Sequence, residues 1–393
     1  MNIFDTRKNK ITEFKSKKDI GIYVCGITPY DAAHLGHIFT FMFYDLMTRW
    51  LTYNGHRVKL VRNITDVDEP IYVKAKELNI PYQELAKKQT KLFKDVMIKM
   101  NFIKPHKEPL ASEFINEMAL SVEDIVKKNY GYLVDKDIYF NTKKVDNFGG
   151  YFNLPPKVIE KLFKSRGGDP DRKNKINTLD FLLWKNIPDP KDPARWQTNL
   201  GYGRPGWHIE CSVMSNHVLG NQFDLHGGGN DLIFPHHESE IAQSLALNNC
   251  HPARYWVHVA PLLLYGEKMS KSLGNLVFAF DLLKEYHPNV IKLALMNYHY
   301  QVGGEWTKEY LDEAVEIYQG LKNVINTNNV KESNINILKS SVFKALDNNL
   351  DTPEIIYCLK AFLSRTSTVK DRSNSNQTDL INILDLLGLN FNL

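Results

Sequence analysis

Short apolar runs alternate with longer amphipathic stretches in the first third of the chain. Residues 21–25 and 56–65 have the pattern of short buried strands, and residues 38–54 between them have the apolar density of a core helix. A strand–helix–strand order of this kind is typical of a parallel sheet. Helical patterns follow from about 68 to 101 and from 112 to 129.

The pattern changes between residues 130 and 200. The stretch "GYLVDKDIYFNT" predicts a hairpin, and residues 165–180 predict a loop rich in Gly, Pro, Asp and Lys. Strand-like runs return with "QFDLHGGGND" and "YWVHVAPLLLY", and amphipathic helices fill the chain from about 279. We therefore expect an α/β fold in which an insertion splits a parallel-sheet domain. The expected parts are 1–130 and 201–300 for the two halves, 131–200 for the insertion and 301–393 for a helical bundle.

Composition narrows the function classes only a little. The formal charge of +4 gives no electrostatic reason, by itself, for tight nucleic-acid binding. Four cysteines that lie far apart do not suggest a disulfide framework. The first ten residues lack the apolar core of a signal peptide, and no run approaches the ~18 apolar residues of a spanning helix. A monomeric cytoplasmic enzyme or binding protein, without a membrane partner, is the expectation.

Two cysteines fall at places where a metal site could form. Cys25 ends the first apolar run, and Cys211 ends "GWHIEC" before a helix-like stretch. In "FPHHESEIAQSLAL", Pro235 predicts a helix start that sets His236 and Glu240 on one helical face. Two thiolates, an imidazole and a carboxylate suit a tetrahedral Zn²⁺ site at the edge of a sheet. A single buried cysteine, however, more often serves packing alone.

The remaining cysteines and the other charged groups of this helix have simpler interpretations. His237 is expected to be a core histidine or a group that supports a ligand, and Glu238 is expected to point elsewhere. Cys250 and Cys358 are expected to be structural.

Three further segments favour a nucleotide. His34 and His37 lie where the first strand gives way to a helix, and backbone N–H groups at such a point favour an anion. Gly36 between them permits close approach of a flat group such as a base. Lys268 and Lys271 occur in "KMSKS", a loop whose two cations can stabilise a polyphosphate. The glycine run of "HGGGND" could contact the nucleotide through its backbone.

Together these residues carry a family pattern. The HxGH of residues 34–37, followed by KMSKS, resembles the class I aminoacyl-tRNA synthetases, and Cys25, "GWHIEC" and "GGGNDLIFPHHESE" narrow the resemblance to the cysteine-activating branch. The resemblance covers nearly the whole chain. It implies a Rossmann-like catalytic domain, L-cysteine and ATP with Mg²⁺ as substrates, one Zn²⁺ and a cysteinyl-adenylate intermediate.

The resemblance also assigns roles to individual residues. It implies His34, His37, Lys268 and Lys271 as catalytic residues, and Cys25, Cys211 and His236, with Glu240, as zinc ligands. It places a further group around cysteine, ATP or the adenylate: Cys25, Gly26, Ile27, Thr28, Gly36, Thr40, Asn63, Ile64, Thr65, Trp207, Gly229, Asn230 and Asp231. Without the resemblance, the threonines could be strand or cap residues, Trp207 could be a core residue, and Asn230 or Asp231 could cap the next helix.

Two families in this branch differ in the acceptor of the cysteinyl group. "CGITPYDAAHLGH", "RGGDPDR" at 166–172 and the end of the chain at "LLGLNFNL", without an anticodon-binding domain, are similar to the mycothiol cysteine ligases, which use the amine of glucosaminyl-inositol. Asp169 and Arg172 would then contact the acceptor. Glu240 and "KMSKSLGN" are instead similar to the cysteinyl-tRNA synthetases. We take the amino-sugar ligase as the first hypothesis and a tRNA synthetase as the alternative. A non-catalytic relative that binds zinc or nucleotide is a third hypothesis, which the intact motifs disfavour.

Overall fold

A computed structural model describes residues 1–393 except 16, 270–273, 328–329, 367–373 and 392–393. Its centre is a parallel sheet in the order β11-β10-β3-β4. The strands are β3 (Asp19–Ile27), β4 (Arg57–Ile64), β10 (Phe223–Gly229) and β11 (Ala253–Val259). Helix α1 (Leu35–Tyr53) connects β3 to β4, which confirms the predicted strand–helix–strand unit.

The two faces of the sheet belong to different cores because successive side chains of a strand alternate. Ile22 and Val24 of β3 pack with α1 in a core that continues into the C-terminal helices. Tyr23 and Cys25 face the opposite side, where the core includes α6 (Trp207–Leu219), α7 (Glu238–Asn248) and the insertion. Cys25 therefore lies between the sheet and this second layer.

Between β4 and β10 the chain leaves the sheet. The helical pattern at 68–101 forms two helices rather than one, because Pro81 separates α2 (Glu69–Leu78) from α3 (Tyr82–Lys99). The pattern at 112–129 forms a 3₁₀ turn, Ala111–Phe114, followed by α4 (Ile115–Lys127).

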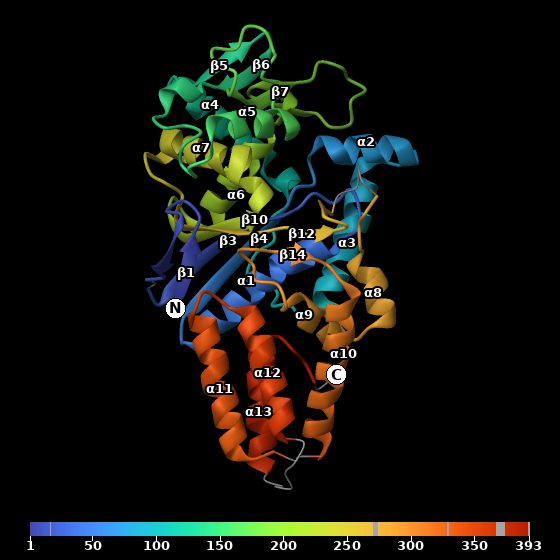
Figure 1. Ribbon diagram of the computed structural model, residues 1–393. Helices are drawn as coiled ribbons and strands as arrows, with labels where there is room; N and C mark the ends of the chain where they lie inside the picture. Colours follow the sequence, from blue (N-terminus) through green and yellow to red (C-terminus); the bar gives the residue numbers. More distant parts are fainter. Residues whose placement is uncertain (16, 270–273, 328–329, 367–373, 392–393) are drawn as a thin grey trace.

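The insertion contains an antiparallel sheet in the order β5-β6-β7-β9-β8, and α5 (Pro156–Ser165). The predicted hairpin is β5 (Gly131–Val134) paired with β6 (Asp137–Phe140). The other strands are β7 (Phe181–Asn186), β8 (Trp196–Thr198) and β9 (Gly201–Pro205), so this sheet continues beyond residue 200. In Figure 1 the insertion lies at the top, above α6 and α7.

The C-terminal helices begin beside the central sheet and continue to the opposite end of the molecule from the insertion (Figure 1). They are α8 (Ala279–Glu285), α9 (Pro288–Leu295), α10 (Lys308–Thr327), α11 (Glu332–Asp347), α12 (Thr352–Thr366) and α13 (Asn374–Leu386). One short strand interrupts the expected run of helices: β14 (Gly304–Glu305) pairs with β12 (Leu262–Leu264), which also pairs with β13 (Glu267–Lys268). A separate hairpin, β1 (Asn2–Asp5) and β2 (Lys10–Glu13), precedes the sheet.

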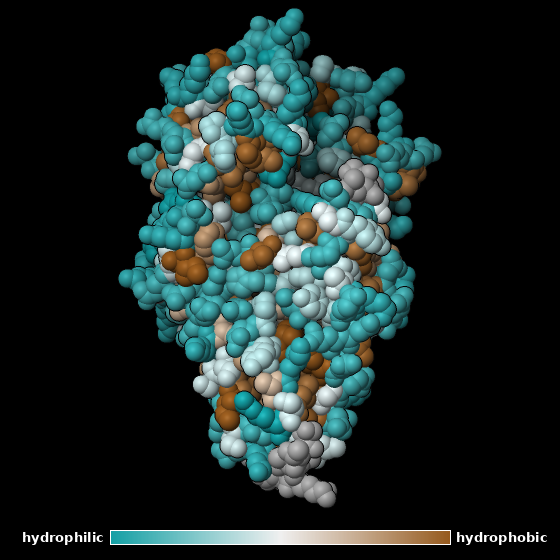
Figure 2. Space-filling view, viewed as in Figure 1, coloured by the Kyte–Doolittle hydropathy of each residue, from teal (hydrophilic) through white to brown (hydrophobic). Residues whose placement is uncertain are grey.

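The surface is mostly polar, with single apolar side chains scattered over it, and the face in Figure 2 is hollowed between the insertion and the body of the molecule. Among the helices that the structure describes, none is both long and apolar enough to cross a membrane.

Candidate functional site

Four buried side chains from distant parts of the chain converge at the carboxyl end of β3. Cys25 comes from β3, Cys211 from α6, Glu240 from α7, and His236 from the segment just before α7. One ligand atom from each lies within 4.8 Å of every other. The Sγ atoms of Cys25 and Cys211 are 3.6 Å apart, and His236 Nε2 lies 3.2 Å from Glu240 Oε1.

These separations fit a single tetrahedral ion. Ligand atoms about 2.0–2.3 Å from a tetrahedral Zn²⁺ lie about 3.3–3.8 Å from one another. The two cysteine sulfurs, and the His236–Glu240 pair, lie close to this range, and Cys25 Sγ is 3.9 Å from Glu240 Oε1. The soft and borderline donors of this group are those that Zn²⁺ prefers.

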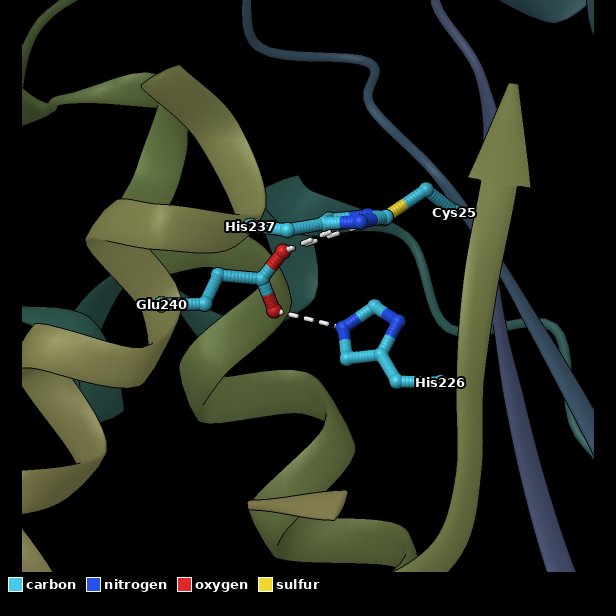
Figure 3. A group of neighbouring side chains, drawn as sticks. All are labelled: Cys25, His226, His237 and Glu240. Atoms are coloured by element: carbon cyan, nitrogen blue, oxygen red, sulfur yellow. Dashed lines mark hydrogen bonds and ion pairs between the residues drawn. The ribbon is translucent and has the colours of Figure 1, made fainter. Parts of the chain in front are cut away.

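A second group of possible ligands shares Cys25 and Glu240 with the first and adds His226 and His237 (Figure 3). His226 Nε2 is only 2.8 Å from Glu240 Oε2, which is a hydrogen-bond distance, and it contacts the carboxylate oxygen that does not face His236. His237 lies 3.3 Å from Cys25 Sγ and 2.7 Å from His258. This geometry suits groups that orient ligands better than a second set of ligands.

Histidines therefore support the first group from several sides. His208 Nδ1 lies 3.0 Å from His236 Nδ1, and when His236 Nδ1–H is the donor to His208, the lone pair of His236 Nε2 is left for a metal. Sequence reasoning anticipated a supporting role for His237 but missed His208, His226 and His258. The only local signal is a buried histidine within an apolar strand, in "FDLH" and "YWVHV".

Burial sets the protonation of the cluster. It lowers the pKa of His236 and His237 well below the usual histidine value, and it lowers the pKa of His208 and His258 to about 3. It raises the pKa of the Cys25 thiol, with further contributions from Cys211 and Glu240. Neutral imidazoles are competent ligands, whereas thiolates at such a buried place require a cation beside them.

The helix predicted to begin at Pro235 follows a kink at Phe234: Pro235 lies in a π-helical turn, Ile233–His237, that leads directly into α7. The Phe234–Pro235 peptide bond is cis, Phe234 has extended backbone angles, and α7 starts at Glu238. His236 and Glu240 nevertheless converge. Glu238 points away from the cluster, as expected, and accepts hydrogen bonds from the N–H groups of Gly149 and Tyr151 at 2.6 and 3.1 Å.

The two histidines of the HxGH motif begin α1. His34 is its N-cap, and its Nδ1 accepts a hydrogen bond from the Gly36 N–H at 3.1 Å. The rings of His34 and His37 lie 3.9 Å apart between centroids. Burial lowers the pKa of His34 to about 2 and that of His37 to about 4, so both imidazoles are uncharged at neutral pH.

The second signature segment lies beside the first. The N–H of Leu35 donates to the Val277 carbonyl, which follows the lysine-rich motif, at 2.8 Å. Lys268 Nζ forms an ion pair with Asp231 Oδ2 at 2.8 Å, and both charges act on the imidazoles of His34 and His37. Burial acts to raise the pKa of Asp231, but Lys268 outweighs it and the pKa is lowered. Lys271 lies outside the described residues.

The glycine run at the end of β10 lies between the metal-ligand cluster and the Asp231–Lys268 pair. A Cβ at Gly228 would lie 3.5 Å from Cys25 Cβ, and one at Gly229 would lie 2.5 Å from Asp231 Oδ1. The backbone at the end of β10 therefore passes directly from the metal-ligand cluster to the Asp231–Lys268 pair. Asn230, in the turn that follows, is exposed.

The other residues implied for adenylate binding lie around the ends of β3 and β4. The Gly26 N–H donates to Asn63 Oδ1 at 2.9 Å, and the Asn63 amide donates to the Thr65 hydroxyl at 3.0 Å. The Thr28 hydroxyl lies 3.4 Å from Asp68. Trp207 stacks on His236 with ring centroids 4.3 Å apart, which places it beside the metal-ligand cluster.

Three of the residues implied for adenylate binding make contacts that stabilise the strands or the helix in which they lie. The backbones of Ile27 and Ile64 pair across β3 and β4, and both side chains are buried. The Thr40 hydroxyl donates to the Gly36 carbonyl one turn earlier in α1, at 3.0 Å. This hydrogen bond is that of a residue inside a helix, so Thr40 is neither the strand nor the cap residue of the alternative interpretation.

Comparison with known proteins identifies the family. The model of the class I (C) tRNA synthetase catalytic domain matches residues 11–316. Cysteine–tRNA ligases of Francisella tularensis subsp. tularensis and subsp. novicida are each 37% identical over 399 aligned residues, covering 99% of this chain and 84% and 85% of those proteins, respectively.

Solved structures of more distant synthetases have the same fold. A methionyl-tRNA synthetase of Mycobacterium tuberculosis in complex with methionyl-adenylate matches with a TM-score of 0.60 at 14% identity, covering 94% of this chain and 90% of that one. A putative arginyl-tRNA synthetase of Campylobacter jejuni matches with a TM-score of 0.57 at 12% identity over the same shares. The parallel sheet with its helices is the class I synthetase fold, and this chain belongs to the family of class I tRNA synthetases with the (C)-type catalytic domain.

Proposed function

We propose that this chain activates L-cysteine with ATP to form cysteinyl-AMP and transfers the cysteinyl group to tRNA. One observation carries the activation step: the zinc-type cluster of Cys25, Cys211, His236 and Glu240 lies at the same sheet edge as the HxGH histidines and the Asp231–Lys268 pair. The relatives named cysteine–tRNA ligases, which align with 99% of the chain, support tRNA as the acceptor.

Amino acid selection motivates the metal. Cysteine and serine differ by one atom, and a pocket of shape alone gains only about 1–3 kcal/mol from so small a difference. Zinc, when bound by the four ligands, would prefer the thiolate of cysteine to the hydroxyl of serine because sulfur is the softer donor. Trp207, stacked on His236, would then bound the pocket on one side.

Activation needs positioning and charge stabilisation rather than covalent catalysis. The neutral imidazoles of His34 and His37 would donate hydrogen bonds to the phosphates of ATP, and Lys268 would supply positive charge while the substrate carboxylate attacks the α-phosphorus. Pyrophosphate is the leaving group of this step, and a tRNA hydroxyl would then attack the acyl carbon, lose its proton and displace AMP. Lys271 is assigned the same role as Lys268 by the motif alone.

The amine of an amino sugar is the second candidate acceptor, favoured by the "RGGDPDR" loop at 166–172. The comparisons give it no support. Asp169 accepts hydrogen bonds from Tyr139 and Lys175, and Arg172 donates to Asp137 and lies over the ring of Tyr139. These side chains therefore hold the insertion together, which weakens their case as contacts for an acceptor.

Pyrophosphate exchange tests the activation step. Zinc-loaded protein should exchange labelled pyrophosphate into ATP with cysteine and far less with serine. If cysteine supports no exchange, both enzymatic hypotheses fail and a non-catalytic relative is left. AMP release with a cysteine tRNA transcript, compared with release with glucosaminyl-inositol, then identifies the acceptor. Release with the amino sugar alone would overturn tRNA as the acceptor.

A further inference from the structure

The insertion contacts the segment that carries two of the metal ligands. This segment, residues 231–240, begins at the partner of Lys268 and ends at Glu240, and we call it the ligand segment. Arg166, directly after α5, donates from Nη1 to the carbonyl oxygens of Asp231 and Phe234, the latter at 2.5 Å. One guanidinium nitrogen thus fixes two backbone carbonyls at the start of the segment.

Two further contacts hold the middle of the ligand segment. The rings of Phe148 and Phe163, both in the insertion, lie 6.2 and 6.4 Å from the ring of Phe234. Glu238, which lies between the ligands His236 and Glu240 in the sequence, has a buried carboxylate that accepts hydrogen bonds from the N–H groups of Gly149 and Tyr151. Each buried bond would leave an unpaired polar group if the insertion moved away.

We propose that the insertion holds the metal ligands in place and that Arg166 is the positioning residue of this contact. Among the described residues, the side-chain hydrogen bonds of Arg166 go to the backbone of Asp231 and Phe234, and none goes to a ligand atom, to the HxGH histidines or to Lys268. Arg166 fixes the backbone that sets His236 and Glu240 against Cys25, and the backbone that sets Asp231 against Lys268. Loss of its two hydrogen bonds should loosen the metal site first, because partners that orient ligands are typically worth 10–100-fold in metal affinity.

Substitution of Arg166→Met tests this role while retaining the apolar stem of the side chain. Zinc affinity, measured by competition with a chromophoric chelator in the absence of substrates, is expected to fall by about tenfold or more. Arg166→Lys, which keeps a cationic donor, should recover part of the loss. Lys164→Met is the matched control: Lys164 lies on α5 but is exposed and pairs with the exposed Asp171, so zinc affinity should not change. A folded Arg166→Met protein with zinc affinity within threefold of the wild type would overturn the proposal.

Hydrogen exchange of the wild-type protein gives a second test that needs no variant. If the insertion and the ligand segment stabilise one another, zinc binding must slow amide hydrogen exchange in both of them. Amides in residues 147–153 should therefore exchange faster after zinc is removed with a chelator, whereas those of the distant α11 should not. Unchanged exchange in residues 147–153 would overturn the proposal even if Arg166→Met failed to fold.

The expected effect of Arg166→Met on cysteine activation rests on the proposed function, whereas the zinc-affinity and hydrogen-exchange measurements do not. In cysteine-dependent pyrophosphate exchange at saturating zinc, Arg166→Met should raise KM for cysteine more than it lowers kcat, because ligand placement matters most for binding the thiol. Equal effects of Arg166→Met and Lys164→Met would argue against a positioning role. Absence of exchange in the wild type would refute the proposed function and leave the zinc measurements valid.

Discussion

Each residue of the metal-ligand cluster is unfavourable on its own. A buried thiol resists ionisation, a buried imidazole resists protonation and a buried carboxylate requires a partner. Glu240 resolves its part of this conflict by placing one oxygen against His226 and the other toward His236. A cation bound to this group would favour the thiolates over the thiols, which is why we interpret the cluster as a candidate metal site.

Cys211→Ser is expected to separate metal binding from nucleotide binding. Replacing a thiolate ligand by a hydroxyl should weaken zinc binding by at least about 100-fold and abolish cysteine-dependent exchange, because the hydroxyl stays protonated. ATP affinity, measured by calorimetry, should change by less than about threefold. Cys250→Ser, at a thiol that donates to the Asn221 carbonyl away from the metal-ligand cluster, is the control. Activation that survives in Cys211→Ser would refute the zinc assignment.

The HxGH imidazoles are expected to stay neutral across the working pH range. Burial lowers the pKa of His37 to about 4, so its ring should take up a proton only well below pH 5. The ring resonances of His37 in a spectrum of ¹⁵N-histidine-labelled protein, assigned with His37→Asn, should not shift between pH 8 and pH 5.5. A titration with a midpoint near 6.5 would contradict this and would make the residue a cation toward ATP.

At the scale of elements, the site depends on segments whose positions no local pattern encodes. The runs that became β3, α1 and β4 are predictable because apolar periodicity is a local property. The register that sets Gly228 of β10 against His258 of β11 is fixed only when the sheet assembles, so His226 and His258 could not be assigned to the cluster from sequence. The same holds for the pairing of β12 with β14, which lie about forty residues apart.

The candidate ligands themselves were predictable for a different reason. Cysteine, histidine and glutamate at strand ends and helix starts are chemically specific, and the family pattern linked segments that lie two hundred residues apart. The sequence could not reveal how the ligand segment turns. It predicted a helix from Pro235, but not the kink at Phe234 or the π-helical turn, Ile233–His237. Arg166 of the insertion contacts this turn, and Gly149 contacts Glu238 directly after it.

Gly26 is expected to tolerate no side chain, because β3 and β4 approach each other closely where their register shifts. A Cβ at Gly26 would lie 1.6 Å from the Asn63 carbonyl oxygen, so Gly26→Ala must push the strands apart and should lower the free energy of unfolding by about 3 kcal/mol. At Gly21 of the same strand, a Cβ would meet no backbone atom closely: its nearest neighbours would be Phe223 Cβ at 3.2 Å and Leu219 Cδ2 at 3.4 Å. Urea unfolding should therefore show Gly21→Ala to be much milder, and equal effects would contradict this explanation.

At the scale of the whole molecule, a network of buried polar side chains joins the catalytic domain to the C-terminal helices. The Arg49 guanidinium on α1 pairs with Asp45 and donates to the Asp385 carbonyl on α13, at 2.8 and 2.9 Å. Lys292 of α9, almost fully buried, donates to the Gly388 carbonyl at 3.0 Å and to the Asn101 carbonyl at 3.3 Å. The bundle is thus fixed to the catalytic domain by charged hydrogen bonds within an apolar core.

Lys292 gives this junction a pH dependence of known sign. Burial lowers the pKa of Lys292 to about 8, while Asp45 acts to raise it and Arg49 to lower it. Between pH 8 and about 10.5 the folded protein has released this proton and the unfolded chain has kept it, so the free energy of unfolding should rise with pH, by up to about 3 kcal/mol. Below pH 8 both states are protonated and this contribution is constant.

The prediction is tested by urea unfolding of the wild type and Lys292→Met at pH 7.5, 8.5 and 9.5. The wild type should gain stability relative to Lys292→Met as pH rises, because only the wild type carries the shifted amine. Tyrosines that ionise on unfolding affect both proteins alike and cancel in the difference. A difference that is independent of pH would mean that Lys292 titrates as an ordinary amine, and that the junction is open to water rather than sealed between the sheet and the bundle.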